Sequence, residues 1–198
     1  MNSAVVGRPR DPRVDASLRE HLVQMLAERG PDGFSVDELA SRSQVSKAAI
    51  YRRYSCRDDL ILAGFEAVNE SMPDVSDLGV RQGLIRLLEW VREAVASGMT
   101  GTWVVAMQQR PQLRELYMTN VVAPRRRAIG DVIHRGQQRG LIAADANLDV
   151  LLTCLSAPAV IMGMHRGGPH PSAGVALDDV VDTVMAGVLS PEARASGW

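Results

Sequence analysis

Residues 34–54 read FSVDELASRSQVSKAAIYRRY, and this stretch carries the clearest structural signals in the chain. Ser35 and Glu38 have the spacing of a capping box, in which a serine and a glutamate three residues later satisfy free N–H groups at a helix start. Phe34 and Leu39 have the spacing of a hydrophobic staple, which fixes how the chain enters the helix. The pattern predicts that a helix begins after Ser35.

A second short helix is predicted directly downstream. We interpret residues 41–44 as a turn that ends the first helix, and Ser46 as the N-cap of a helix that continues through residue 54. Two short helices joined by a tight turn form a helix-turn-helix, in which the second helix enters a DNA groove. The sequence therefore predicts a DNA-binding unit at residues 34–54.

The two faces of this second helix differ in character. At about 100° per residue, Ile50 and Tyr54 share one face, on which we expect them to pack inward. Ala48 and Arg52 lie on the opposite face, with Tyr51 on the flank. Small residues let the backbone approach a surface closely, and arginine offers a bidentate donor for guanine or phosphate. This arrangement is typical of a recognition helix in a major groove.

Several residues around this unit are candidates for DNA contact. Ser35 and Ser46 lie at predicted helix N-termini, where free N–H groups favour a phosphate oxygen. Arg8 and Arg10 lie on an arm that is expected to be flexible and to reach a minor groove. Taken singly, each candidate has an ordinary alternative as a cap, a core residue or a solvated arginine, but their coincidence favours DNA binding. The predicted contact set is Arg8, Arg10, Ser35, Ser46, Lys47, Ala48, Ala49, Tyr51, Arg52, Arg53 and Arg57.

Composition limits how such a protein would bind nucleic acid. The 198 residues carry a formal net charge of −1, so DNA binding requires a local basic surface rather than an overall positive charge. The 2 cysteines exclude a disulfide framework and a cysteine-rich zinc module. The chain has neither an apolar signal segment at its start nor a run of about 18 apolar residues. We therefore expect a soluble, cytoplasmic protein with no membrane partner.

Helical periodicity continues along the chain, and no strand-like alternation is sustained. We expect an all-α protein with a flexible basic arm at residues 1–10, a DNA-binding domain at 11–72 and a C-terminal helical domain at 73–198. Pro124 falls inside the longest helical stretch and predicts a kink or a split there. Beyond residue 73, the expected helices cover residues 80–97, 101–109, 111–139, 147–166 and 177–189.

Residues 35–60, from Ser-Val-Asp-Glu-Leu-Ala to Arg-Asp-Asp-Leu, resemble the DNA-binding signature of the TetR family of transcriptional regulators. The similarity covers residues 8 to about 68, and its most specific element is Tyr-x-x-aromatic followed by a basic-acidic-acidic-Leu sequence. The resemblance implies that Lys47 and Tyr51 contact phosphates and that Arg57 is the basic residue that opens the fourth helix.

Two positions depart from the family pattern. Gln44 replaces the glycine that is common in the turn, so the turn must form without a residue that adopts left-handed backbone angles easily. Ala49 replaces a frequent serine or threonine, which removes one hydroxyl that would otherwise contact DNA.

The remainder of the chain resembles the family less specifically. Residues 111–141, which end in Arg-Gly-Leu, look like a C-terminal domain of actinobacterial-type members. Those proteins are dimers joined through their last two long helices, which correspond here to roughly residues 147–166 and 177–189. The first of these segments is also too apolar for a lone surface helix. We therefore expect a homodimer, whose two recognition helices about 34 Å apart would read a palindrome.

The resemblance also implies a ligand pocket in the second domain. Tryptophan and methionine at helical spacing are more often ordinary core, but Trp103 and Met107, one turn apart, are the leading candidates. Because few charged residues fall among the candidates, we expect an apolar or aromatic ligand, with at most a polar contribution from His134 or His165. No cofactor and no metal site are expected. The candidate set is Trp90, Met99, Trp103, Met107, Tyr117 and Met162.

The predicted function is a sequence-specific transcriptional regulator, a repressor that binds a palindromic operator as a homodimer and is released by a small ligand. One alternative is a regulator without a small-molecule effector, either an activator or a redox-responsive protein that uses Cys56, just after the predicted recognition helix. A helical enzyme is the remaining alternative. No phosphate-binding glycine loop, His-Glu zinc helix or nucleophile elbow in the sequence supports it.

Overall fold

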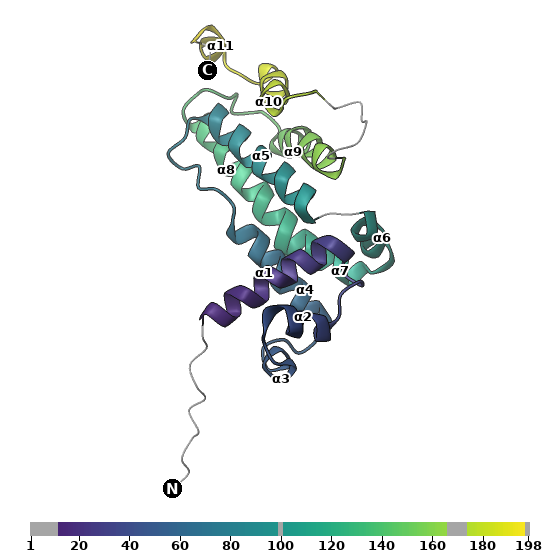
Figure 1. The fold of residues 1–198 in the computed structure, drawn as a ribbon. Coiled ribbons are helices and arrows are strands. Elements are labelled where there is room, and N and C mark those ends of the chain that lie inside the picture. Colours follow the sequence, from purple (N-terminus) through teal and green to yellow (C-terminus); the bar gives the residue numbers. More distant parts are fainter. Residues whose placement is uncertain (1–11, 99–100, 166–173, 197–198) are drawn as a thin grey trace.

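The computed structural model describes residues 12–98, 101–165 and 174–196, and within these ranges the protein consists of helices joined by loops (Figure 1). The predicted all-α fold is thereby confirmed. An isolated bridge joins Ile142 to Leu189. The elements are α1 Pro12–Arg29, α2 Val36–Ser43, α3 Lys47–Tyr51, α4 Arg57–Glu70, α5 Val80–Gly98, α6 Gly101–Gln109, α7 Pro111–Tyr117, the π-helical segment η1 Met118–Val122, α8 Ala123–Gln138, α9 Leu148–Met164, α10 Leu177–Ala186 and α11 Pro191–Ser196.

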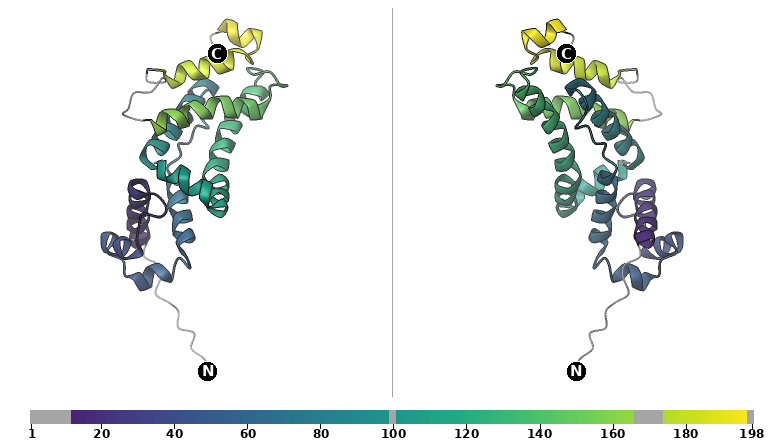
Figure 2. Two further views of the ribbon diagram at one scale, coloured as in Figure 1. Left: turned by 90° about the vertical axis from the view of Figure 1, so that its right-hand side faces the viewer. Right: turned by 90° about the vertical axis from the view of Figure 1, so that its left-hand side faces the viewer.

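The helices form an elongated molecule (Figure 1). Helices α1, α2 and α3 lie at one end, where α3 is the outermost, and α10 and α11 lie at the opposite end. Helices α5 and α8 run along the middle, and the contact between α5 and α9 is the most extensive between any two helices of the described chain. Helix α4 lies between α1 and the α7–η1 segment, so it links the two ends (Figure 2).

The first four helices share one hydrophobic core. Leu22 of α1, Leu39 of α2 and Ile50 of α3 are fully buried in it. Helices α1 and α4 approach closely at Gly64, where an added Cβ would lie 2.5 Å from Leu26 Cδ1. Buried side chains of α6, α7 and η1 belong to the same core. Side-chain packing therefore continues past residue 73, where the sequence predicts a domain boundary.

Helices α5, α8, α9 and α10 enclose a second core. Leu155 of α9 is fully buried in it, and the backbones of α5 and α9 approach most closely at Gly163, where an added Cβ would lie 2.5 Å from the Arg92 carbonyl oxygen. Arg81 of α5 holds α10 through a two-point ion pair with Asp182, at 2.7 Å (Nε–Oδ1) and 2.6 Å (Nη2–Oδ2). The hydrogen bond from Arg81 lowers the pKa of the Asp182 carboxyl below its usual value.

The longest predicted helix is split, and the interruption takes the form of a π-helical segment. The Ala123 N–H bonds to the Met118 carbonyl, five residues earlier, instead of closing an α-helical turn. Pro124 has no N–H to offer to the Asn120 carbonyl. The side chain of Asn69 on α4 donates to that carbonyl oxygen at 2.5 Å. The irregular turn therefore ties the long helix to α4.

The first helix of the helix-turn-helix is longer than predicted, and the second is shorter. The expectation of a turn over residues 41–44 is wrong, because α2 continues to Ser43, whose hydroxyl donates to the Leu39 carbonyl at 2.6 Å. Only Gln44 leaves the helical conformation. Helix α3 ends at Tyr51, and the chain continues in hydrogen-bonded turns to residue 54.

Replacing Gly163 with alanine is expected to lower the free energy of unfolding by about 1–3 kcal/mol, because the added methyl group overpacks the α5–α9 contact. Gly130→Ala on α8 is the matched control, since its Cβ would meet only Leu152 Cδ2, at 4.0 Å. The control is expected to gain up to about 1 kcal/mol from the better helix propensity of alanine. Urea denaturation measures both variants, and equal stabilities would contradict the close approach of α5 and α9.

Candidate functional site

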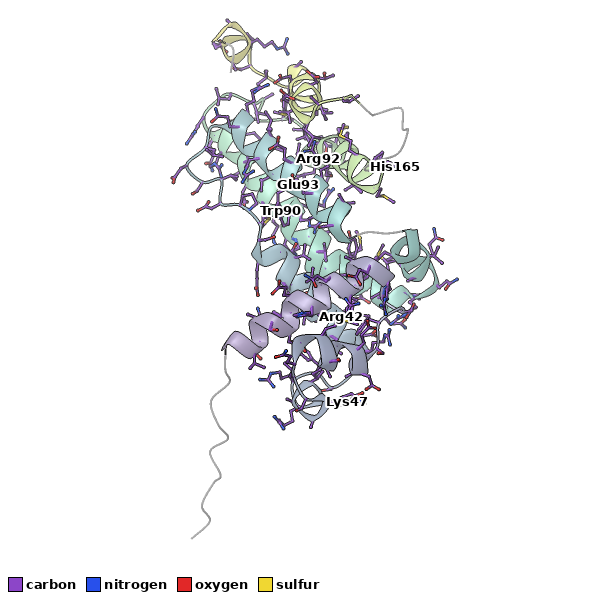
Figure 3. The ribbon with its side chains drawn as sticks, viewed as in Figure 1. Arg42, Lys47, Trp90, Arg92, Glu93 and His165 are labelled. Carbon is purple, nitrogen blue, oxygen red and sulfur yellow. The ribbon has the colours of Figure 1, made fainter. Side chains whose placement is uncertain are left out.

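Helix α3 is anchored by its inner face and exposes its outer face at the end of the molecule. Ile50 is fully buried against α1 and α2, and the hydroxyl of Ser46 accepts the Ala49 N–H at 3.3 Å at the start of the helix. Tyr51 is 59% exposed, and Arg52 is exposed as well. Lys47 and Ala48 are also exposed, and Figure 3 shows Lys47 at this extremity. The inward and outward faces agree with the helical wheel, except that Ala49 is half-buried.

The turn before α3 is made by a residue with strained backbone angles. Gln44 has φ 56° and ψ 28°, and it is the one non-glycine residue with positive φ in the described ranges. The Val45 N–H then bonds to the Ala40 carbonyl at 3.2 Å, and the Val45 side chain is buried. This left-handed residue turns the chain from α2 into α3. The family resemblance implies a glycine at the same position.

Two of the predicted DNA-contacting arginines make internal contacts. Arg53 pairs with Asp15 of α1 at 2.7 Å and donates to the Ala49 carbonyl at 3.0 Å. Arg57 donates to two backbone carbonyls of the α1–α2 loop, at 3.0 Å and, at Phe34, 2.7 Å. Its guanidinium carbon lies 4.4 Å from the centre of the Phe34 ring. These contacts fix α3 and α4 against the preceding helices, which gives both arginines a structural role.

The remaining predicted contacts lie near the same surface or outside the described residues. Ser35 caps α2, because its hydroxyl accepts the Glu38 N–H at 3.1 Å. Lys47 forms an ion pair with Asp37 across the turn, and both side chains stay more than half exposed. Arg8 and Arg10, with the rest of the predicted arm at residues 1–10, lie outside the described residues. The exposed residues of α3 and its two flanking positions therefore form the candidate nucleic-acid interface: Ser46, Lys47, Ala48, Tyr51 and Arg52.

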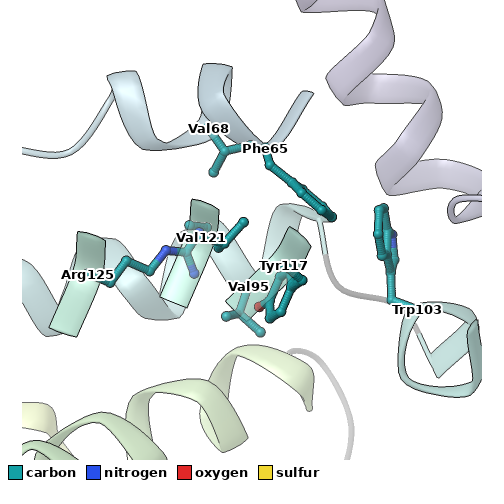
Figure 4. Close-up of a pocket in the computed structure, with 8 residues that line it drawn as sticks. Phe65, Val68, Val95, Trp103, Tyr117, Val121 and Arg125 are labelled. Carbon is teal, nitrogen blue, oxygen red and sulfur yellow. The ribbon is translucent and has the colours of Figure 1, made fainter. Parts of the chain in front are cut away.

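A small cavity of about 40 Å³ lies between α4 on one side and helices α5 and α8 on the other (Figure 4). Aromatic rings form one side of it: the ring centre of Phe65 is 5.1 Å from that of Trp103 and 5.4 Å from that of Tyr117. The lining residues are Phe65, Val68, Ala94, Val95, Trp103, Tyr117, Val121 and Arg125.

Arg125 is the charged residue of this otherwise apolar lining. It is only 9% exposed, its Nε–H donates to the Asn69 side-chain oxygen at 3.3 Å, and its guanidinium lies 4.9 Å from the Trp90 ring centre. Burial lowers the pKa of Arg125, and burial likewise raises the pKa of Tyr117. Within the described ranges, no Asp or Glu lies within ion-pairing distance of Arg125. The cavity therefore combines an aromatic side with a cation that has no carboxylate partner among the described residues.

The predicted pocket residues are divided among different places. Trp103 and Tyr117 line the cavity, and Trp90 lines an adjoining groove of about 540 Å³ that shares Val68 and Ala94 with it. A third hollow contains Met162 beside Arg92 and Glu93 of α5, the residues labelled with Trp90 in Figure 3. Met107 is half-buried and lines none of these three hollows, and Met99 lies outside the described residues. The candidate histidines, His134 and His165, are exposed.

Sequence reasoning missed Arg125, although a signal was present. Arg125 lies four residues after Val121 and four before Ile129, so it falls on the same helical face as two residues that are fully buried or nearly so. Arg125 also opens a run of three arginines, a pattern that is typical of a solvated surface. The neighbouring Arg127 is exposed, as an arginine in such a run usually is.

Other classes of site find no support in the described part of the chain. It holds no cluster of three or more potential metal ligands. Among its helices, none is long and apolar enough to cross a bilayer. Cys56, at the start of α4, and Cys154, on α9, are both exposed free thiols.

Two family models match the sequence. Residues 20–63 match the model described as "Bacterial regulatory proteins, tetR family". Residues 77–186, more than half of the 198 residues, match the model described as "Tetracyclin repressor-like, C-terminal domain". The matches fall on the helix-turn-helix and on the helices that carry the second core.

Relatives and solved structures point the same way. The chain is 29% identical over 187 residues to the DNA-binding transcriptional repressor TetR of Mycobacteroides abscessus, covering 90% of this chain and 95% of that protein. It is 28% identical over 160 residues to an uncharacterized HTH-type transcriptional regulator of Bacillus subtilis, covering 77% and 79%. The fold is similar to that of a TetR transcriptional regulator from Agrobacterium tumefaciens (TM-score 0.71, 16% identity, covering 94% and 99%). It is also similar to that of a putative transcriptional regulator from Saccharomonospora viridis in complex with choline (TM-score 0.63, 20% identity, covering 91% and 100%).

Replacing Gln44 with glycine is expected to raise the free energy of unfolding by about 1 kcal/mol, because left-handed backbone angles cost an L-residue roughly 1–2 kcal/mol that glycine avoids. Gln24→Gly, an exposed position within α1, is the matched control and is expected to lower stability by about 1 kcal/mol. Chemical denaturation compares the two. A loss of stability in both variants would contradict the strained turn.

Proposed function

Because the chain belongs to the TetR family of bacterial regulatory proteins, we propose that it represses transcription as a homodimer that binds a palindromic operator and is released by a small ligand. The chain is a helix-turn-helix transcriptional regulator of this family. The relatives that it matches are transcriptional regulators rather than enzymes. A protein that binds chromosomal operators works beside the chromosome, so we propose a cytoplasmic location.

The observation that carries the proposal is the division of α3 into a buried and an exposed face. Ile50 is fully buried, while Lys47, Tyr51 and Arg52 extend from the same short helix into solvent at the end of the molecule. Exposed Ala48 leaves room for the helix to approach the floor of a groove. We assign base reading to Arg52, and phosphate contacts to Lys47 and Tyr51. The ion pair between Lys47 and Asp37 would have to open as the lysine reaches a phosphate.

The proposed dimer interface is an apolar stripe on the outer face of α9. Val150, Ile161 and Met164 are 55%, 42% and 40% exposed, which is unusual for residues of this kind along one helix. Cys154 and Ala157, also exposed, lie between them at steps of three and four residues, so the five side chains share one face. The opposite face of α9 packs into the second core. A second copy that covers this stripe would remove it from water.

Ligand release is supported by the position of the cavity. Phe65 and Val68 line the cavity from α4, the helix that also carries Leu60 and Ile61 into the core of the DNA-binding domain. A ligand that changes the packing of these side chains would change the orientation of α4 and therefore of α3. The Saccharomonospora viridis regulator is in complex with choline, so a protein of this fold holds a small molecule. We propose that the cavity beside α4 does so in this chain.

Arg52→Ala is expected to relax base preference at one position of each half-site and to cost roughly 1–3 kcal/mol of binding free energy, because arginine reads a base edge directly. Selection from a randomised DNA library measures the preference of each protein. A base preference identical to that of the unmodified protein would rule out base reading by Arg52.

Lys47→Ala is expected to weaken binding to all sequences alike and to reduce the slope of log affinity against log salt by about 1, because one phosphate contact is lost. Titrations over a range of salt concentrations measure this slope. An unchanged slope would exclude a phosphate contact at Lys47. Arg52→Ala is the control, because it also removes a positive charge but is expected to change base preference.

Ile161→Glu is expected to convert the dimer into a monomer and to abolish tight operator binding, because a carboxylate would be buried in the proposed interface. Val105→Glu is the matched control, since Val105 is 51% exposed on α6, away from the stripe. Light scattering and operator titration measure the two variants. A dimer that persists in Ile161→Glu would show that α9 does not form the interface.

A further inference from the structure

We propose that the cavity beside α4 binds a small organic carboxylate, whose anionic group pairs with Arg125 and whose apolar part lies against Phe65, Trp103 and Tyr117. This inference deepens the ligand-binding part of the proposed function and rests on it for its regulatory meaning. It replaces the expectation of a purely apolar ligand with that of an amphipathic anion.

The first argument is the cost of the buried guanidinium. Arg125 is 91% buried, and an isolated charge in such a place is strongly unfavourable unless a partner compensates it. In the described part of the chain its Nε–H bonds to Asn69, and its guanidinium carbon lies 4.9 Å from the centre of the Trp90 ring, while its two Nη groups donate to no protein atom. Its nearest neighbours thus supply a neutral oxygen and a ring, and no negative charge.

Second, three other arginines outside the helix-turn-helix are paired with carboxylates. Arg81 forms a bidentate pair with Asp182, and Arg110 pairs with both Asp32 and Asp58. Arg126, the next residue along the chain, pairs with Asp149. These arginines are more exposed than Arg125 and still have a carboxylate partner. The most buried one lacks a carboxylate in the described ranges and lines a cavity, which indicates that its counter-ion comes from outside the chain.

The third argument is the polarity of the lining. Figure 4 shows Arg125 at one end and Trp103 at the other, with Val121 and Val68 between them. A guanidinium matches a carboxylate through two parallel hydrogen bonds, and the aromatic end favours a ring or a branched hydrocarbon. A cavity of about 40 Å³ admits a small acid only if lining side chains move on entry, and it excludes a large lipid. The adjoining groove beside Trp90 shares Val68 and Ala94 with the cavity.

The test measures binding directly, without DNA. The full-length protein is titrated with benzoate, benzamide, benzylamine and inorganic phosphate, using tryptophan fluorescence, because Trp103 lines the cavity and Trp90 contacts Arg125. Benzoate is expected to bind about 10- to 100-fold more tightly than its neutral amide, as a charge-assisted hydrogen-bonded pair requires. Benzylamine and phosphate are expected not to saturate in the same range.

Variants assign the effect to Arg125. Arg125→Met is expected to remove the preference for benzoate over benzamide, whereas Arg127→Met, the same change at an exposed arginine two residues away, is expected to keep it. Arg125→Met is also expected to raise the melting temperature of the ligand-free protein, because it removes an uncompensated buried charge. Arg125→Gln is the second variant, isolating the charge from the length of the side chain.

Several results would overturn the inference. These are equal binding of benzoate and benzamide, no saturable binding of benzoate, binding of phosphate as tight as that of benzoate, or a benzoate preference that survives Arg125→Met. A lower melting temperature of Arg125→Met together with an unchanged ligand preference would assign Arg125 a structural role. Benzoate binding that leaves operator affinity unchanged would refute ligand release under the proposed function but leave the carboxylate site standing. Operator binding without any carboxylate binding would do the reverse.

Discussion

The indole of Trp103 packs against Phe65 of α4 and donates its N–H to the Leu26 carbonyl of α1 at 3.0 Å. These contacts join α6 to the two helices on which the helix-turn-helix is built. Arg110, at the end of α6, adds ion pairs to Asp32 in the loop after α1 and to Asp58 in the first turn of α4. The DNA-binding helices therefore share a core with α6, and Trp103 ties that core to α1 and α4.

Helix α4 transmits this constraint because its two halves face different neighbours. Leu60 and Ile61 pack into the core under α3, while Phe65 and Val68 line the cavity. One turn farther, Asn69 bonds both to Arg125 and to the Asn120 carbonyl of the π-helical segment. A ligand that binds better to one orientation of α4 than to another shifts the population of α3 orientations by that difference in affinity. Under the proposed function, α4 is the element that would carry this shift from the cavity to the candidate nucleic-acid interface.

The sequence predicts those features of the fold and the site whose causes lie within a few residues of each other. The caps Ser35 and Ser46 and the inward face of Ile50 follow from spacing within a few residues, and both are confirmed by the structure. The end of α2 was mispredicted, because a single left-handed residue, Gln44, makes the whole turn. The internal partners of Arg53 and Arg57 come from distant segments, so charge alone suggested DNA contact. The helical spacing of Arg125 indicates that it is buried, whereas the two arginines that follow it indicate an exposed surface.

In the proposed function, α3 reads DNA as one half of a symmetric pair. Its most direct test is selection of fragments of the source genome by the purified full-length protein, followed by footprinting of the fragments retained. We expect one recurring motif with two-fold symmetry, whose half-sites are centred about 34 Å, or one helical turn, apart and are protected together. Retention of fragments without a shared motif, or protection of a single asymmetric half-site, would contradict it.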